Sequence, residues 1–501
     1  MSALAADRGC TVPLPDGNVP WPPPGLAALH REMRIDDAWY SGDHERLAAV
    51  YRDQPHREDG RRRLWGRHRG QRPGRRDGRM HIPLAGDIAT TSADLLFTEQ
   101  PVFTVEDTTT QDRLDELVEA GLAKTLLEAA EVAAALGGVY LRVTWDASLA
   151  PRPLLTTVHA DAAVPEFRWG ILTAVTFWHE LASDTATVWR HLERHEPGRV
   201  LHGLYQGTPD RLGTRVPLTE HPEVAALTDS LGPQGDTVET GIPALTAAYI
   251  PNVGPNRKHR GSSLGRSDYG APLYDLMDAL DEAWTSWMRD IRLGRARLIV
   301  PDGYLRDHGP GRGASFDADR EIWQSLNIPP TENGAGITLS QFAIRVEEHA
   351  RTTDSIVQQA VRSAGYSVQS FGLGDSAAVT ATEINARERR SMTTRAKKAR
   401  YWLPALPDML HVLLMLDRRL FTPGLVPERP RVEFGTAVSE EPSSVAQTLA
   451  LLSQAEAIST DTKVRRLHPE WDETAVREEV DRILAESGAA VPDPMQTGSL
   501  P

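Results

Sequence analysis

The first residues that could do chemistry are a serine and the two glycines around it. Gly261, Ser263 and Gly265 match the G-x-S-x-G pattern in which many hydrolases hold a nucleophilic serine. This pattern needs a strand before it and a helix directly after it, because the sharp turn between them exposes the serine oxygen. No alternating apolar pattern precedes Gly261, and helical periodicity resumes only at Pro272. A serine hydrolase that uses Ser263 is therefore only a remote alternative.

A second group, His191, Glu193 and His195, carries side chains that bind metal ions. The three alternate within an expected strand, where the two histidines lie roughly 13 Å apart at about 3.3 Å per residue. One metal ion cannot bind both, so we expect exposed strand residues. The sequence also has no HExxH, no GxxxxGK[ST] loop and no strand-linked GxGxxG. We therefore expect no enzymatic activity, no catalytic residue, no metal and no cofactor.

Charge, cysteine usage and hydropathy argue against several other classes of protein. The chain has 55 basic and 69 acidic residues and a net charge of -14, which disfavours tight binding to nucleic-acid phosphates. Its single cysteine, Cys10, excludes an intramolecular disulfide and a cysteine-rich metal site. No apolar run approaches the ~18 residues of a membrane span, and no apolar segment near the N-terminus resembles a signal peptide.

Two unusual segments precede the first long helix. Residues 1–25 contain six prolines and predict an extended, polyproline-like arm. Residues 61–79 contain nine arginines and one acid, Asp77. High charge with few apolar residues prevents packing, so we interpret this segment as a solvated surface loop. An arm that contacts phosphates is the alternative.

The pattern between residues 80 and 250 predicts helices beside an antiparallel sheet. Apolar residues recur at helical spacing from Leu114 to Leu136, and the glycine at 137 ends that helix. Alternating residues follow as a strand, and further strands are expected at 171–181 and as a hairpin around Pro197 and Gly198. The fold class is therefore α+β.

Two long helices organise the second half of the chain. Apolar periodicity predicts them at 272–293 and 346–364, on either side of a β-rich insert. A loop rich in glycine and serine covers 366–379.

A third long helix follows this loop. Thr380 and Glu383 form a capping box that opens it. Pro404 and Pro407 lie inside it and must kink it. The tail from 445 to 488 is predicted to be helical and acidic.

Several short strings occur in a fixed order with these elements: Ala38–Gly42, Pro83–Ala89, Ser92–Phe97, Gly137–Leu141, Ser267–Gly270 and Thr380–Ile384. In this order, and with the helix–insert–helix–loop–kinked-helix succession, the chain resembles the SPP1-like portal proteins of tailed bacteriophages, in their actinobacteriophage form. The resemblance runs from about Trp39 to Glu486. The Arg-rich loop and the Pro-rich arm depart from the family pattern.

The resemblance implies a place in the virion and a set of partners. Portal proteins of this family form a ring, dodecameric as a rule, at one capsid vertex. The large terminase subunit drives double-stranded DNA through the channel, and the DNA later leaves by the same route. Implied partners are therefore terminase, the major capsid and scaffold proteins, a head–tail adaptor and DNA read without sequence specificity, but no membrane. Synthesis takes place in the cytoplasm of the host bacterium.

The family's parts fall on this chain with the following expected boundaries: Pro-rich arm 1–25, α+β wing 26–270, first stem helix 271–293, clip 294–345, second stem helix 346–365, tunnel loop 366–379, kinked wing helix 380–435, and crown with tail 436–501. The resemblance thus implies a portal fold with an α/β wing, a two-helix stem, a small β-rich clip, a long kinked helix and a helical crown.

Candidate site residues follow from these parts. An acidic channel does not hold DNA by its phosphates as a basic one would. The expected roles are channel lining by Asp275, Asp278 and Glu282; DNA contact in the tunnel loop by Ser370, Phe371, Gly372, Leu373, Gly374 and Asp375; docking of terminase or adaptor on the clip by Asp307, Asp317, Asp319, Arg320 and Glu321; and stem packing by Trp284 and Trp287. The alternative function is another head–tail structural or scaffold protein, although simple adaptors are much shorter.

Overall fold

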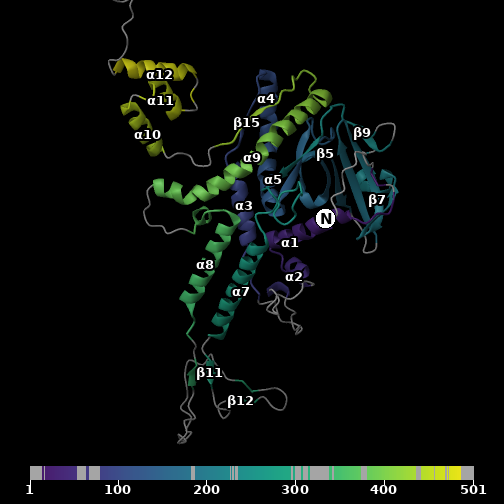
Figure 1. Cartoon of the computed structure of the whole chain (residues 1–501), viewed down its shortest axis with the longest axis vertical. Coiled ribbons are helices and arrows are strands. Elements are labelled where there is room, and N and C mark those ends of the chain that lie inside the picture. The colour runs from purple at the N-terminus through teal and green to yellow at the C-terminus, as the bar shows by residue number, and fades with distance from the viewer. Residues whose placement is uncertain are drawn as a thin grey trace, which may run out of the picture. The chain divides into compact units, whose positions relative to one another are not determined.

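Figure 1 shows the fold, which comes from a computed structural model of the chain. The structure describes residues 14–15, 17–52, 64–66, 79–181, 187–225, 227, 231, 235–294, 297–299, 306–307, 314–315, 338–340, 343–373, 381–435, 442–455, 457–468, 471 and 473–486. The chain divides into two compact units, Met1–Asp375 with Arg387–Gly435, and Ser376–Ala386 with Thr436–Pro501. The first unit mixes helices with antiparallel sheets, which confirms the α+β class.

Five helices come first in the chain. They are α1 (Ala27–Ser41), α2 (His44–Arg52), α3 (Leu84–Phe97), α4 (Thr108–Leu117) and α5 (Ala123–Leu136). The helix predicted over 114–136 is interrupted, because Val118–Leu122 takes a π-helical turn in which Gly121 has a φ of 114°. α5 ends at the predicted glycine, since Gly137 adopts a φ of 85° that few other residues tolerate.

Two antiparallel sheets follow α5. The smaller has the strand order β10 (Ala247–Pro251), β2 (Gly138–Thr144), β3 (Leu154–His159). The larger runs in chain order through β4 (Ala163–Arg168), β5 (Ile171–Glu180), β6 (Val188–Glu196), β7 (Arg199–Thr208) and β8 (Arg211–Val216), with β9 (Thr237–Glu239) also paired to β7. The predicted hairpin is confirmed, since β6 and β7 pair from Glu196 opposite Arg199. A short helix, α6 (Pro222–Ala225), follows β8.

The described part of the Pro-rich arm packs on the larger sheet. Leu14 and Trp21 are buried in a cluster with residues of that sheet. Tyr205 donates its hydroxyl hydrogen to the carbonyl oxygen of Pro15 at 2.6 Å, and the Leu212 amide donates to the carbonyl of Val19 at 2.9 Å. The described part of the arm thus covers one face and the edge of the sheet.

Two long helices, α7 (Ala271–Leu293) and α8 (Val346–Ala364), lie side by side and run in opposite directions (Figure 1). Both agree with the predicted ranges. Between them in the chain, β11 (Arg297–Ile299) pairs with β14 (Thr338–Ser340), and β12 (Arg306–Asp307) pairs with β13 (Ala314–Ser315). The predicted β-rich insert therefore contains short antiparallel ladders in its described part.

Two hydrophobic clusters hold the first unit together. One joins α1, α3, α5, α7 and α8 and includes Trp39 and Leu280. The other joins α3, α5 and β2 to α9 (Ala381–Leu420) and includes Leu126 and Trp402. α9 carries Pro404 and Pro407 inside its length, and β15 (Arg431–Glu433) after it pairs with β1 (Val102–Thr104).

The second unit contains the tail helices α10 (Pro442–Gln454), α11 (Thr460–Leu467) and α12 (Glu473–Glu486). Ser459 caps α11, since its side chain accepts the amide hydrogen of Thr462. The helical tail is therefore confirmed. Among the helices described in either unit, we find none with the length and apolar character that a membrane span requires.

Candidate functional site

The predicted stem helices pack through small and apolar side chains. On α8, Ala360 and Val361 are fully buried. On α7, Met277 and Leu280 belong to the same hydrophobic cluster. α7 carries the candidates for channel lining and stem packing.

Two acids on α7 are buried and bind another segment of the chain. Asp278 is 3% exposed, and its Oδ1 accepts the amide hydrogen of Leu64 at 3.0 Å. Asp281, three residues later, accepts from Trp65 Nε1 at 3.0 Å and from the Ile82 amide at 2.9 Å. The prediction that Asp278 lines a channel is therefore wrong, because its own chain encloses the carboxylate.

These acids anchor the described part of the Arg-rich segment. Leu64 and Trp65 are buried within a short 3-10 helix, Leu64–Gly66. The Arg79 guanidinium lies 4.7 Å from the centre of the Trp65 ring and donates to the carbonyls of Leu64 and Trp65 at 3.2 and 3.3 Å. A wholly solvated loop over 61–79 was therefore the wrong interpretation at these positions. The signal that could have revealed the anchor is the apolar pair Leu64-Trp65 among the arginines.

The other two acids predicted to line a channel share one face of α7. Asp275 and Glu282 are seven residues apart, which is about two helical turns. Asp275 is exposed and Glu282 is half-buried. Both stay candidates for channel lining.

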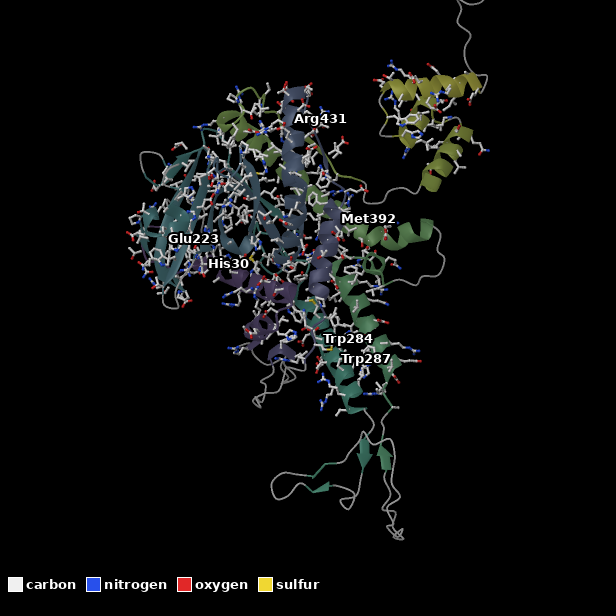
Figure 2. The ribbon with its side chains drawn as sticks, turned by 180° about the vertical axis from the view of Figure 1, so that it is seen from behind. His30, Glu223, Trp284, Trp287, Met392 and Arg431 are labelled. Carbon is white, nitrogen blue, oxygen red and sulfur yellow. The ribbon has the colours of Figure 1, made fainter. Side chains whose placement is uncertain are left out.

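Trp284 and Trp287 lie next to each other on α7, as Figure 2 shows, with ring centroids 4.9 Å apart. The Trp287 ring also stacks on His349 of α8, at 5.7 Å between centroids and 7° between planes. Packing against the second stem helix is therefore seen for Trp287. Both tryptophans are half-buried within one chain.

A polar cluster joins the last turns of α7 to the first turn of α8. Asp290 Oδ2 accepts a hydrogen bond from His349 Nε2 at 3.0 Å and another from Arg345 at 3.3 Å. The bonds from His349 and Arg345 lower the pKa of the Asp290 carboxyl. This cluster ties the two helices together beside the predicted clip.

The predicted tunnel loop begins as an ordered structure. Gly365 ends α8 with a φ of 102°, and Thr394 on α9 donates to its carbonyl at 2.6 Å. Val368–Phe371 form a 3-10 helix. Ser370 Oγ lies 2.8 Å from Ser391 Oγ on α9. The first half of the loop is therefore fastened to α9.

The residues predicted to contact DNA lie at the end of this ordered part of the loop. The Phe371 ring lies 6.2 Å from the Tyr366 ring and packs on the core. Ser370 and Phe371 make these contacts inside the chain but are only half-buried, so their contact with DNA stays a prediction. Gly372 and Leu373 follow, and Leu373 is 47% exposed. The predicted residues Gly374 and Asp375 lie outside the described residues.

A buried polar network, which the sequence did not reveal, lies behind this loop. Lys398 on α9 donates to Asp268 Oδ2 at 2.5 Å and to Ser92 Oγ at 2.6 Å. Tyr366, just after α8, donates to the same carboxylate oxygen at 2.7 Å, and Asn252 Nδ2 donates to the other at 2.9 Å. Burial lowers the pKa of Lys398, against the opposing effect of Asp268, and raises the pKa of Tyr366. The network joins α3, α9, the end of α8 and the loop before α7.

The clip candidates are described only in part. Asp307 pairs with Ala314 in the β12–β13 ladder. The other four candidates, Asp317, Asp319, Arg320 and Glu321, lie outside the described residues. Docking on this segment stays a prediction.

The G-x-S-x-G segment lacks the geometry of a hydrolase. β10 ends at Pro251, well before Gly261, and α7 begins only at Ala271. Ser263 is exposed on the loop between them. Among the hydrogen bonds of the described residues, none joins Ser263 to a histidine.

His191, Glu193 and His195 lie on β6, as predicted, but they are buried rather than exposed. Arg142 of the smaller sheet pairs with Glu193 at 2.5 Å, and His195 lies 2.9 Å from the other oxygen of Glu193. Burial alone raises the pKa of Glu193, but the hydrogen bond from His195 and the charges of His195 and Arg142 outweigh it and lower that pKa. The described ranges contain no group of three side chains placed to hold a metal ion.

His191 belongs to a second part of this buried cluster. Its ring stacks on that of His202, with centroids 5.3 Å apart and planes at 1°. Burial and the neighbouring His202 lower the pKa of His191 to about 3. β6 is a central strand covered on both faces, which alternation in the sequence could not show. The prediction of exposed residues failed for that reason.

Comparison with known proteins decides the family. A family model described as "Phage portal protein, SPP1 Gp6-like" matches residues 30–493. The chain belongs to this family. Portal proteins are structural components of the phage particle and not enzymes, so the hydrolase alternative falls away. The actinobacteriophage form stays a prediction.

Solved structures and curated proteins add little to this assignment. The neck of a native GTA particle computed with C12 symmetry matches with a TM-score of 0.39 and 13% identity, over 77% of this chain and 89% of that chain. The neck of an empty GTA particle computed with C6 symmetry matches with a TM-score of 0.39 and 14% identity, over 77% and 90%. No curated protein matches the chain.

Proposed function

We propose that this portal protein forms a closed homo-oligomeric ring, a dodecamer, at one vertex of the capsid. Terminase packages double-stranded DNA through the ring, the DNA leaves by the same route, and a head–tail adaptor attaches to the ring. The observation that carries the proposal is the match of the portal family across residues 30–493.

The geometry of the α7–α8 pair supports a channel role. α7 carries the exposed Asp275 and the half-buried Glu282 on one face. Carboxylates on a channel wall repel phosphates, so the duplex can slide without being held. In this proposal α7 and α8 are the stem, the β11–β14 region is the clip that meets terminase and adaptor, and α10–α12 belong to the crown. The remaining α+β region is the wing, which faces the capsid and scaffold proteins.

The size of the purified particle tests the proposal. Twelve chains of 55.1 kDa give a ring of roughly 660 kDa. Analytical ultracentrifugation should find that mass, and negative-stain images should show rings with a central hole. A monomer or small oligomer at all protein concentrations would contradict the ring and favour another head–tail structural protein.

A further inference from the structure

The turn between β4 and β5 holds a tryptophan in an unfavourable backbone conformation. Trp169 has a φ of 54° and Gly170 a φ of 80°. Two positive φ values in a two-residue hairpin define a turn that favours Asn-Gly. Among the residues that the structure describes, Trp169 is the one non-glycine residue with a positive φ. A bulky side chain at such a position is a genuine outlier.

Contacts within the chain do not account for this outlier. The Trp169 side chain is 90% exposed, and Ile171 after the turn is 70% exposed. Single exposed apolar residues are ordinary, but a strained and exposed tryptophan is not. Tryptophan, like tyrosine and arginine, is enriched at the energetic centres of protein interfaces. The turn therefore has the features of a contact that another surface covers. The exposed Trp169 side chain on this turn is called the knob below.

A hollow of about 260 Å³ lies at the opposite edge of the same sheet. Leu204, Val216, Pro217 and Leu218 supply its apolar lining. The ion pair of Arg215 with Asp236, 2.9 Å long, supplies a polar side. Its volume is below the ~300–1,000 Å³ typical of small-molecule sites and suits one large side chain.

Knob and hollow also lie at different levels along the strands. The Leu204–Val216 pair of the hollow is level with His179 near the end of β5, whereas Trp169 precedes the first residue of β5, Ile171. Several strand spacings of about 4.8 Å and roughly eight residues of strand length therefore separate them, which is well over 20 Å. The knob of one chain therefore cannot fill the hollow of that chain.

We propose that Trp169 of one subunit inserts into this hollow on the neighbouring copy of the same chain. The inference rests on the proposed ring. Different patches at opposite edges make a head-to-tail contact, and repetition of such a contact closes a ring when the rotation between copies divides a full turn. The charges agree, because the exposed Arg168 stands beside the knob and the exposed Glu220 lies two residues beyond Leu218 at the hollow.

Replacement of Trp169 by asparagine tests the knob. Asparagine tolerates a positive φ, so Trp169→Asn should melt at the same temperature as the wild-type chain or higher. The protein concentration at which half the chains are in rings should rise at least ten-fold, measured by mass photometry. Leu149→Asn is the matched control, since Leu149 is a 76% exposed residue on the turn between β2 and β3, and it should leave that concentration unchanged.

Three outcomes overturn the proposal. If Trp169→Asn leaves the concentration at which half the chains are in rings unchanged, Trp169 makes no contact between subunits, although the ring itself forms. If that concentration is unchanged but the variant is incorporated less well into capsids, Trp169 contacts a capsid protein instead. Failure of the wild-type chain to form rings at any concentration refutes the proposed function itself, and this inference with it.

A cross-link tests the hollow. Cys10 is the single cysteine, so Cys10→Ser gives a thiol-free background. Arg168→Cys with Glu220→Cys should then form disulfides between subunits and give a ladder of covalent oligomers on a non-reducing gel. A disulfide needs Cα atoms within about 7 Å, which excludes a bond within one chain. Rings that assemble but give no ladder would overturn this placement of the knob.

Discussion

Lys398 Nζ lies 2.5 Å from Asp268 Oδ2, and both side chains are only 2% exposed. This ion pair joins α9 to the loop that leads into α7, and Tyr366 at the end of α8 donates to the same carboxylate. The elements that we assign to the stem, tunnel loop and wing thus meet at one buried carboxylate. This carboxylate therefore fixes the base of the predicted tunnel loop, because the end of α8 before the loop and α9 after it both bind to Asp268.

Removal of one partner of this pair should be costly. Lys398→Met leaves the Asp268 carboxylate buried and unpaired, which costs about 3–5 kcal/mol of stability for buried pairs of this kind. Urea unfolding followed by tryptophan fluorescence measures the loss. Lys397→Met, at the exposed neighbouring position on α9, is the control and should change stability little. The double variant Lys398→Met with Asp268→Asn should recover much of the loss, and an equal loss in both would contradict a charge effect.

The buried histidines of the larger sheet predict a fall in stability in acid. The pKa of His191 is about 3 in the fold, against an ordinary value of 6.5 in the unfolded chain. Below pH 6.5 the unfolded state binds a proton that the folded state does not, so stability falls from pH 6.5 down to about 3. The contribution of His191 is at most a few kcal/mol.

Thermal melting at a series of pH values checks this dependence. His191→Gln should flatten the curve in that window, although His202 and His179, whose pKa values burial also lowers, keep part of the slope. Glu193 and Arg142 face the same cluster in both proteins. His159→Gln, at an exposed histidine on β3, should leave the curve unchanged. Equal slopes for His191→Gln and wild type would refute the prediction.

Asp281 should control access to the Arg-rich segment. Asp281→Ala removes the acceptor of Trp65 Nε1 and of the Ile82 amide, and each unsatisfied buried donor costs about 1–3 kcal/mol. Release of the Trp65 side chain from α7 should make the arginine bonds around it more accessible. Trypsin digestion followed by mass spectrometry should show faster cleavage there. Asp275→Ala, on the exposed face of α7, is the control and should be digested at the wild-type rate. Equal digestion rates for Asp281→Ala and Asp275→Ala would show that Asp281 does not anchor the segment.

Local signals were enough to predict the regular elements. The apolar periodicity of 272–293 and 346–364 is a property of each helix alone, and α7 and α8 follow it. The glycine after Leu136 ends α5 because a left-handed residue is needed at that point, whatever packs around it. The turn residues Pro197 and Gly198 likewise specify the β6–β7 hairpin.

Such local signals do not predict contacts between segments that are distant in the sequence. Asp268 and Lys398 are 130 residues apart in the sequence, and neither has a spacing that indicates the other. The local pattern gives Asp278 an exposed helix position, but Leu64, which is 214 residues away in the sequence, donates its amide hydrogen to it. His191 shares one face of β6 with Glu193, and Arg142 reaches that face from a strand 51 residues away from Glu193 in the sequence. In each case tertiary packing, and not the local pattern, decides whether a polar side chain meets water.

Leu373 offers the sharpest test of contact between the tunnel loop and DNA. It is exposed and follows the fastened part of the loop, whereas a lysine at Gly372 would be strained by the φ of 68° there. In the proposed ring, Leu373→Lys places a cation beside the duplex, where it attracts phosphates, so packaging should slow at low salt. Attraction between exposed charges is screened over about 10 Å at 0.1 M salt, so the rate should recover as salt rises. In vitro packaging with the cognate terminase measures the rate, and Leu373→Gln is the uncharged control of similar size. Equal rates for the lysine and glutamine variants at every salt concentration would show that position 373 does not approach the duplex.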